Sequence, residues 1–527
     1  MMVPYLQRLI VPTGRPWNPD PVSVISPELS VAHNFGGLLP KYSLYRLNSG
    51  ITATLCNLMK KIVLLSVLLL LSYEGFAMNV STNRSPVGEG EEGWKAGVAK
   101  TDITPEQAIW LAGYASRTEP STGTLHPLWA KALALEDAGG NRAVLVTADI
   151  LGWTKGISDE IRSRLDKKLD LSKSQVLLNS SHTHSGPVLE HALVDIYPID
   201  EEERRKIQAY SDHLIDRVVQ LVEQAVSDLE PAAIYAGNGS ARFQVNRRNN
   251  NAATLVKQTD LNGPNDYAVP VIKVTGPGGS LKAITFGYAC HPTVLSGNEW
   301  SGDYPGFAQI ELEQDHPEAI AMFFQGAGAD QNPLPRRTVA LARQYGRTLA
   351  AAVDRVLEEE EMKKLSPTLS TAYTEVELHL NEPPSKEALA RHAESASGYQ
   401  QRWAERLLEK AEQGKSIRES YPFPLQVWQL GNQKIFALGG ELLIEYAVQL
   451  KEIFGYGSFV MGYSNDVMAY IPTTEVLHEG GYEGSSSQAV YGMPAKWSYD
   501  IEPIIIKGMV DLAQSIGIDP PVNKLID

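Results

Sequence analysis

The residues best suited to chemistry are two histidines separated by a single residue, His182 and His184. They stand in the stretch Asn-Ser-Ser-His-Thr-His-Ser-Gly-Pro (residues 179–187), which begins at the last residue of the predicted strand 175–179. On an extended strand, side chains two positions apart point to the same side, and neutral imidazole is a common nitrogen ligand of zinc. A pair of surface or hydrogen-bonded histidines would give the same pattern. The strand before the pair and the Gly-Pro turn after it favour a metal site.

A third histidine, His291, repeats this arrangement. It follows the apolar residues 283–289 and opens a His-Pro-Thr triplet. A lone histidine at such a place is more often a core residue than a ligand, but its position just beyond a predicted strand matches that of His182. Asp303 comes shortly afterwards and could orient a ligand through a hydrogen bond.

A glycine-rich loop with polar side chains follows the next apolar run. Residues 325–333 read Gln-Gly-Ala-Gly-Ala-Asp-Gln-Asn-Pro and contain Asp330 and Asn332. Such a loop can present backbone N–H groups to an anion or an oxyanion. It is not a phosphate-binding P-loop, because no Gly-Lys-Ser/Thr follows. A tight turn is the simpler explanation.

Three residues nearer the C-terminus complete the set of candidates. Glu441 follows the apolar residues 434–438 and is either a ligand or a charge at the start of a helix. Tyr470 and Tyr482 lie twelve residues apart in loop-like sequence and would be unremarkable alone.

The elements that must position these residues alternate between strands and helices. Short apolar runs followed by amphipathic stretches predict an α/β fold, with mixed sheets flanked by helices. We see no linker, so one large domain is expected from residue 94 to residue 527. The predicted strands cover residues 142–148, 175–179, 269–274, 283–289, 319–324, 434–438 and 459–462, and the predicted helices cover residues 201–229, 340–362 and 386–413.

The composition excludes several classes of protein. Of the 527 residues 43% are hydrophobic and 21% charged, as in ordinary globular proteins. Lys and Arg number 47 against 62 Asp and Glu, and this acidic balance argues against nucleic acid as a partner. Two cysteines, Cys56 and Cys290, are too few for a disulfide framework or a cysteine-ligated metal site.

The beginning of the chain contains the pattern of a secretory signal. Residues 59–77 have two lysines, an apolar run of about ten residues and a final Gly-Phe-Ala. We interpret residues 1–58 as a non-native upstream extension, residues 59–77 as a cleaved signal and residues 78–93 as a flexible leader. The alternative is that residues 1–58 are a genuine leader and that the apolar run after it forms a buried helix. The expected location is therefore the periplasm or the exterior.

Taken together and in order, these segments resemble the catalytic domain of the neutral/alkaline (non-lysosomal) ceramidases. The resemblance extends from about residue 94 to the end of the chain. The ordered set is specific, although no single motif is. The matching segments are residues 97–105, 112–114, 179–187, 291–293, 302–303, 330–333 and 440–441, with Tyr470 and Tyr482.

The resemblance implies a zinc amidohydrolase. The family's metal is held by two histidines, a glutamate and a tyrosine, which fall here on His182, His291, Glu441 and Tyr470.

The resemblance also implies residues beside the metal. His184 and Tyr482 would line the site near the scissile carbonyl, and Arg247 matches a position near the substrate head group. Asp330 and Asp303 would orient ligands or the loop.

The sequence departs from the family in two places. The family has an Asp-x-Ser-Pro loop with an essential serine, and here Asn332 stands in its place. An asparagine can donate a hydrogen bond but cannot act as that nucleophile. In addition, only about 45 residues follow Tyr482, too few for the family's C-terminal immunoglobulin-like domain of about 100 residues. We interpret the chain as a bacterial branch that shares the metal site.

The expected mechanism needs no serine. Zinc lowers the pKa of a bound water to about 7 and polarises a carbonyl, and His184 or Tyr482 would stabilise the oxyanion or protonate the leaving group. The expected partner is a lipid or another N-acyl substrate, with transient contact to a membrane surface and without nucleic acid or an evident protein partner. A zinc esterase or deacylase on another substrate, and a non-enzymatic binding protein with a decayed site, remain as alternatives.

Overall fold

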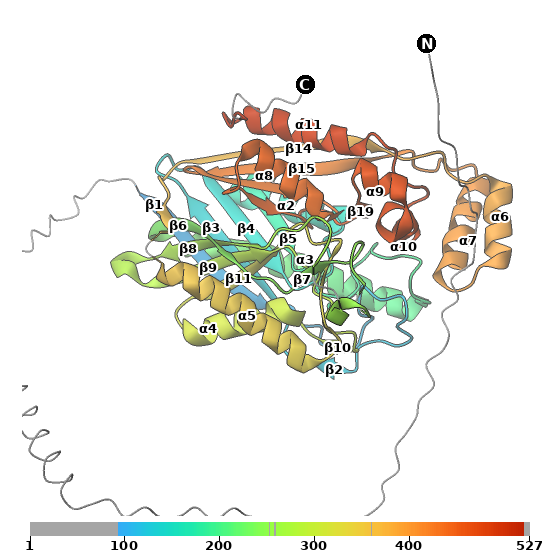
Figure 1. Cartoon of the computed structure of the whole chain (residues 1–527), viewed down its shortest axis with the longest axis horizontal. Helices are drawn as coiled ribbons and strands as arrows, with labels where there is room; N and C mark the ends of the chain where they lie inside the picture. Colours follow the sequence, from blue (N-terminus) through green and yellow to red (C-terminus); the bar gives the residue numbers. More distant parts are fainter. Residues whose placement is uncertain (1–92, 252, 258–259, 360, 521–527) are drawn as a thin grey trace, which may run out of the picture. The chain divides into compact units, whose positions relative to one another are not determined.

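The polar segments singled out above lie at the ends of strands in a layered α/β structure (Figure 1). The computed structural model describes residues 93–251, 253–257, 260–359 and 361–520, which belong to one compact unit, Gly88–Asp527. The predicted upstream extension and signal, and residues 78–92 of the leader, lie outside the described residues. Within the described part, no helix is both long and apolar enough to cross a membrane.

The larger sheet has nine strands in the order β11-β9-β8-β6-β1-β3-β4-β5, with β13 paired to β6. Neighbours are mostly antiparallel, but β4 and β5, and also β9 and β11, run parallel. The strands are β1 (Trp94–Asp102), β3 (Trp129–Glu136), β4 (Arg142–Ala148), β5 (Val176–Ser180), β6 (Glu230–Ser240), β8 (Ala268–Thr275), β9 (Leu281–Tyr288), β11 (Ile320–Gln325) and β13 (Lys363–Lys364).

One face of this sheet is covered by helices. Alternate side chains of β3, β4 and β5 pack against α2 (Lys155–Leu169) and α3 (Glu201–Ser227). Those of β8, β9 and β11 pack against α4 (Asp303–Asp315) and α5 (Val339–Glu358). Helix α5 buries residues spaced three and four apart, from Ala342 to Val356, as an amphipathic helix should.

The other face packs against a second, mixed sheet of four strands in the order β14-β15-β16-β18. The outer face of that sheet is covered by α8 and α11, so the layers are helix, sheet, sheet and helix. Figure 1 shows α11 with β14 and β15 at the top and α4 with α5 at the bottom. These elements are β14 (Leu369–His379), β15 (Ser420–Leu430), β16 (Gln433–Leu438), β18 (Phe459–Met461), α8 (Ile444–Phe454) and α11 (Ile501–Gln514).

Short elements complete the described fold. They are β2 (Gly123–Thr124), β7 (Gln244–Asn246), β10 (Glu299–Trp300), β12 (Gln331–Pro333), β17 (Glu441–Leu442), β19 (Tyr470–Ile471), α9 (Thr474–Glu479), a π-helical turn (Tyr482–Ser486) and α10 (Ser487–Val490). Strand β17 pairs with β19, and β7 pairs with β12.

The expected fold class and single large domain are confirmed, and each of the seven predicted strands is present within two residues of its expected bounds. The prediction of one helix over residues 386–413 is wrong. Two helices, α6 (Lys386–Ser395) and α7 (Tyr399–Glu412), form a hairpin. The break covers residues 396–398, and Gly398, directly before α7, has a φ of 64° that suits glycine and lies outside the right-handed helical region.

Asn179, the last residue but one of β5, joins three strand ends. Its Oδ1 accepts from the backbone N–H of Gln325 at the end of β11 (2.8 Å), and its Nδ2 donates to the carbonyl of Gly462 just after β18 (2.8 Å). Strands β5 and β11 stand at opposite ends of the sheet order. This fully buried amide therefore brings the loops after the two sheet ends together.

Candidate metal centre

Three side chains from different strand ends converge on one point. The Nε2 atoms of His182 and His291 are 3.2 Å apart, and each lies 3.2 Å from Oε2 of Glu441. His182 follows β5, His291 follows β9 and Glu441 opens β17. All three are buried. Three of the four predicted ligands are thus brought together.

His184 joins the same group, but not for the reason we expected. Strand β5 ends at Ser180, and His182 has a φ of 61°, so the two histidines do not lie on an extended strand. The left-handed turn at His182 instead places the rings edge to face, with the Nε2 atoms 3.3 Å apart. One ring nitrogen from each of His182, His184 and His291 lies within 4.8 Å of the other two, so His184 is also a candidate ligand.

Backbone carbonyls fix the protons of two rings. Nδ1 of His182 lies 2.6 Å from the oxygen of Leu151, and Nδ1 of His291 lies 2.9 Å from that of Gly328. A carbonyl oxygen can only accept, so Nδ1 carries a proton in both rings, and in the neutral form of each ring Nε2 presents a lone pair. Both lone pairs meet the carboxylate of Glu441.

The electrostatics of this group favour a bound cation. Burial lowers the pKa of His291 to about 4, against the opposing effect of Glu441, so the ring is neutral near pH 7. Burial, together with the other two histidines, holds the pKa of His184 well below its usual value. Burial opposes ionisation of Glu441, yet His182 and His291 hold the pKa of its carboxyl well below the usual range. An ionised carboxylate and the neutral ring of His291 therefore meet at one buried point, which suits a bound cation.

The donor set fits zinc. A tetrahedral zinc centre with bonds of about 2.0–2.1 Å has neighbouring ligand atoms about 3.3–3.4 Å apart. The three separations of 3.2 Å come close to this spacing. Buried imidazole and carboxylate donors, with Nδ1 held by backbone carbonyls, are typical of zinc sites.

Tyr470, the fourth predicted ligand, lies beside Glu441. The two residues are register partners in the parallel pair β17–β19 and so project to the same face. The ring of Tyr470 stacks over that of His291 with centroids 6.4 Å apart, and its hydroxyl accepts from Nη2 of Arg247 (3.2 Å). Tyr482, a predicted catalytic residue, packs edge to face on Tyr470 and is 43% exposed, so it can meet a ligand.

Arg247, the predicted substrate-binding residue, stands over the rings of both tyrosines at 5.6 Å. Its Nε donates to Oε1 of Glu483 (2.7 Å), which balances its charge. The structure therefore places Arg247 with Tyr470 and Tyr482 on one side of the centre.

Asp330 and Asn332, the other predicted catalytic residues, hold loops in place. Oδ1 of Asp330 accepts from the backbone N–H of Ile444 at the start of α8 (3.0 Å), and Oδ2 accepts from Asn246 (3.1 Å). Oδ1 of Asn332 accepts from the hydroxyl of Thr293 (3.5 Å). Both residues are buried beside the histidine loop.

Two tyrosines that contact Glu441 escaped the sequence reasoning. The hydroxyl of Tyr491 donates to Oε1 (2.5 Å), and that of Tyr463 lies 3.5 Å from Oε2. Neither belongs to a motif with a recognisable spacing. The only sequence signal is that Tyr463 directly follows a predicted strand, as the histidines do.

A pocket of about 320 Å³ opens beside Tyr491 and is bounded in part by α7. Its walls combine apolar side chains, such as Leu151 and Met468, with cationic ones, such as Arg406 and Lys410. It is thus a hollow of mixed character that reaches Tyr491, a neighbour of the candidate centre.

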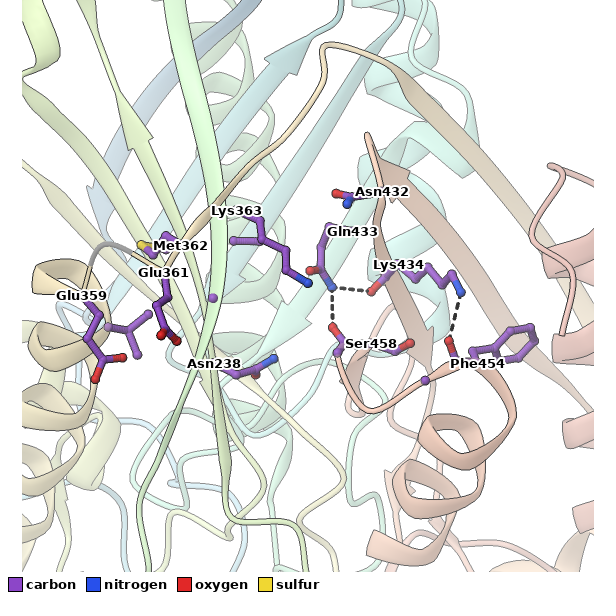
Figure 2. A pocket seen from close by; sticks show the side chains of 15 residues that line it. Asn238, Glu359, Glu361, Met362, Lys363, Asn432, Gln433, Lys434, Phe454 and Ser458 are labelled. Carbon is purple, nitrogen blue, oxygen red and sulfur yellow. Dashed lines mark hydrogen bonds between the residues drawn. The ribbon is translucent and has the colours of Figure 1, made fainter. Parts of the chain in front are cut away.

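The pocket in Figure 2 lies elsewhere. It is lined by Asn238 and Lys363 from the larger sheet and by Gln433, Lys434 and Ser458 from the smaller one. None of its lining residues belongs to the candidate centre, and Lys434 is bound to the carbonyl of Phe454.

Comparison with known proteins finds a matching family, related sequences and related folds. Residues 94–333 match the family described as neutral/alkaline non-lysosomal ceramidase, N-terminal. The chain is therefore similar to this family over a little less than half of its length. The predicted resemblance is thereby confirmed.

Individual relatives match over part of their length. The neutral ceramidase of Pseudomonas aeruginosa is 26% identical over 233 residues, which are 42% of this chain and 34% of the relative. Neutral ceramidase B of Dictyostelium discoideum is 25% identical over 282 residues, 49% of this chain and 38% of the relative. The matches thus span little more than a third of these relatives.

Two solved structures share the fold. The crystal structure of the Pseudomonas aeruginosa neutral ceramidase gives a TM-score of 0.59 at 20% identity and covers 76% of this chain and 73% of that one. A structure titled ceramidase complexed with C2 gives 0.63 at 18% identity, covering 82% and 78%. Glu441, Tyr470 and Tyr482 lie beyond the family match, so their place in the centre rests on the geometry above.

Proposed function

We propose that this chain is a zinc-dependent hydrolase that cleaves an N-acyl amide bond, with a ceramide-like lipid as the first candidate substrate. The observation that carries the proposal is the convergence of the His182 and His291 lone pairs on the carboxylate of Glu441. The match of residues 94–333 to the ceramidase family supports amide hydrolysis. The apolar side chains in the pocket beside Tyr491, among them Leu151, Leu189 and Met468, support a substrate with an acyl chain.

His182, His291 and Glu441 would hold the metal, with Tyr470 beside them as the fourth ligand. When bound, zinc would lower the pKa of a water molecule that it holds and polarise the scissile carbonyl. Hydrolysis breaks the C–N bond, transfers the water oxygen to the acyl carbon and leaves a proton on the departing amine.

His184 is suited to proton transfer. Its Nδ1 is buried and, among the described residues, has no hydrogen-bond partner, whereas the other two rings are fixed by carbonyls. Because the protein does not fix its tautomer, His184 can exchange a proton with the substrate. Tyr482 and Arg247 would bind the polar part of the substrate from the opposite side.

No serine nucleophile is needed in this scheme. Asn332 is bound to Thr293 and orders the loop. We therefore expect Asn332→Ser to change the rate of amide hydrolysis by less than about threefold, since one neutral hydrogen bond is exchanged for another. A gain of a hundredfold or more would show that the chemistry depends on a hydroxyl at this position. Steady-state kinetics with both proteins makes the comparison.

A zinc esterase or deacylase is the second candidate, favoured by the replacement of the family serine by Asn332. A fluorescent ceramide, its ester analogue and an N-acetylated sugar, each with and without chelator, distinguish the two. Chelator-sensitive cleavage of the ceramide supports the first proposal. Cleavage of the ester or the sugar alone would replace it with the second, and cleavage that resists the chelator would exclude both.

Export belongs to the same proposal. It rests on the signal pattern of residues 59–77. Mass spectrometry of the native N-terminus should find a chain that begins near Met78, and an intact leader in the exported protein would contradict it. A lipid substrate would also require transient contact with a membrane surface.

A further inference from the structure

Two adjacent arginines after β12, Arg336 and Arg337, stand beside the candidate centre without an acidic partner. Nη1 of Arg336 donates to the hydroxyl of Thr293 (3.3 Å), and Nη1 of Arg337 donates to the hydroxyl of Tyr114 (3.0 Å). Within the described part of the chain, neither arginine makes an ion pair. Arg336 is half-buried and Arg337 is exposed, so a ligand can reach them.

Both partners of these arginines touch the metal-binding residues. The ring of Tyr114 packs on that of His184, with centroids 4.7 Å apart. Thr293 donates its backbone N–H to the carbonyl of His291 (2.9 Å). The arginine pair therefore borders the centre on the side of His184 and His291.

The positive charge at this border is not neutralised by the protein. Arg247 is paired with Glu483, but Arg336 has no such partner. Burial and repulsion from Arg337 and Arg247 lower the pKa of Arg336. A guanidinium nevertheless stays charged. Arg337 interacts electrostatically with the carboxylate of Asp303.

Asp303 does not remove this charge. Its buried carboxylate already accepts backbone N–H groups from Val294, Leu295 and Tyr304. Helix α5 begins at Val339, directly after the arginines, and its N-terminal end adds further positive potential.

We propose that Arg336 and Arg337 bind an anionic group of the substrate, so that the preferred substrate is an N-acyl amide with a carboxylate or a phosphate near the scissile bond. This inference rests on the proposed amide hydrolysis. A guanidinium offers a planar fork of donors that matches either anion. A neutral ceramide would leave both arginines without a counter-charge.

The test compares three amides with the same acyl chain: N-lauroylglycine, N-lauroyl phosphoethanolamine and the neutral N-lauroylethanolamine. We expect the full-length protein to cleave one of the anionic amides with a kcat/KM at least about tenfold above that of the neutral one. Which of the two is preferred distinguishes a carboxylate from a phosphate. In Arg336→Gln and Arg337→Gln this preference should fall by about tenfold or more, toward equal cleavage, because a charge-assisted hydrogen bond is lost.

The matched control is Arg347→Gln, on the exposed surface of α5, which removes the same charge and should leave the preference unchanged. Equal cleavage of neutral and anionic amides by the unmodified protein would overturn the inference. An equal loss for all three substrates in Arg336→Gln would also overturn it, because that result indicates a structural role.

Calorimetry separates this inference from the proposed function. If no amide is cleaved, the proposed function fails. The anion site would still be supported if N-lauroylglycine or N-lauroyl phosphoethanolamine binds more tightly than N-lauroylethanolamine and if this difference is lost in Arg336→Gln. Equal binding of all three compounds would exclude it.

Discussion

Both carboxylate oxygens of Glu441 have close neighbours. Oε2 faces the histidines, and Oε1 accepts a hydrogen bond of 2.5 Å from the hydroxyl of Tyr491. Such outer hydrogen bonds orient a ligand and tune its basicity. In the proposed centre, Tyr491 would therefore support metal binding without touching the metal itself.

Tyr491→Phe should weaken zinc binding by about 10- to 100-fold, because Glu441 loses the hydrogen bond that orients it. Competition with a chromophoric chelator measures the affinity. Tyr463→Phe is the matched control, since its hydroxyl lies 3.5 Å from the carboxylate and should matter less. Equal affinities for Tyr491→Phe and the unmodified protein would contradict this role.

A second prediction for a single residue concerns Asp466, which lies outside the candidate centre. Burial raises the pKa of its carboxyl to about 7, against a hydrogen bond donated by Tyr421 (2.6 Å). The pKa is higher in the folded than in the unfolded chain, so between about pH 4 and pH 7 the folded state binds more protons. The contribution to stability is therefore full at low pH and is lost as the pH rises through 7.

The unmodified protein should lose about 1–3 kcal/mol more unfolding free energy between about pH 5 and pH 8 than Asp466→Asn does. Urea unfolding at the two pH values gives the difference. Parallel pH profiles for the two proteins would show that Asp466 does not titrate in this range.

Strand ends are the elements that assemble the centre. The candidate metal ligands His182 and His291 follow β5 and β9, and Glu441 opens β17. Asn179 fixes the end of β5 to β11 and to the segment after β18. The same amide satisfies buried backbone groups of Gln325 and Gly462. Removing it leaves them without partners in a site closed to water.

Asn179→Ala should lower the unfolding free energy by about 2–4 kcal/mol, because two buried backbone groups lose their hydrogen bonds. Denaturant unfolding provides the value. Asn432→Ala, at an exposed turn, should change it by less than about 0.5 kcal/mol. If the two variants were equally stable, the joining role of Asn179 would be wrong.

Sequence patterns predicted these elements where the local signal was clear. Compact apolar runs marked seven strands, and their polar ends located the site. The pattern failed for residues 386–413, where charged, helix-favouring residues on both sides concealed the break at Gly398. It also failed at His182, because a left-handed residue between a strand and a turn leaves no periodic trace. Tyr491 could not be found, since its role depends on a contact made 50 residues away in sequence.

In the whole molecule, a pocket with apolar and charged walls and a pair of arginines both border one buried centre. The pocket borders Tyr491, while Arg336 and Arg337 border His184 and His291. An amphiphile with an acyl chain and an anionic head would match both features. The family motifs predicted the centre from the sequence, but not the arginines, because their importance depends on the missing counter-charge.

The most direct test of the central claim is the zinc content of the purified chain, measured by mass spectrometry for the unmodified protein, His182→Ala and the exposed control His213→Ala. We predict about one zinc ion per chain in the unmodified protein and the control, and a large loss in His182→Ala. Full zinc in His182→Ala, or none in the unmodified protein, would contradict a metal centre built on His182, His291 and Glu441.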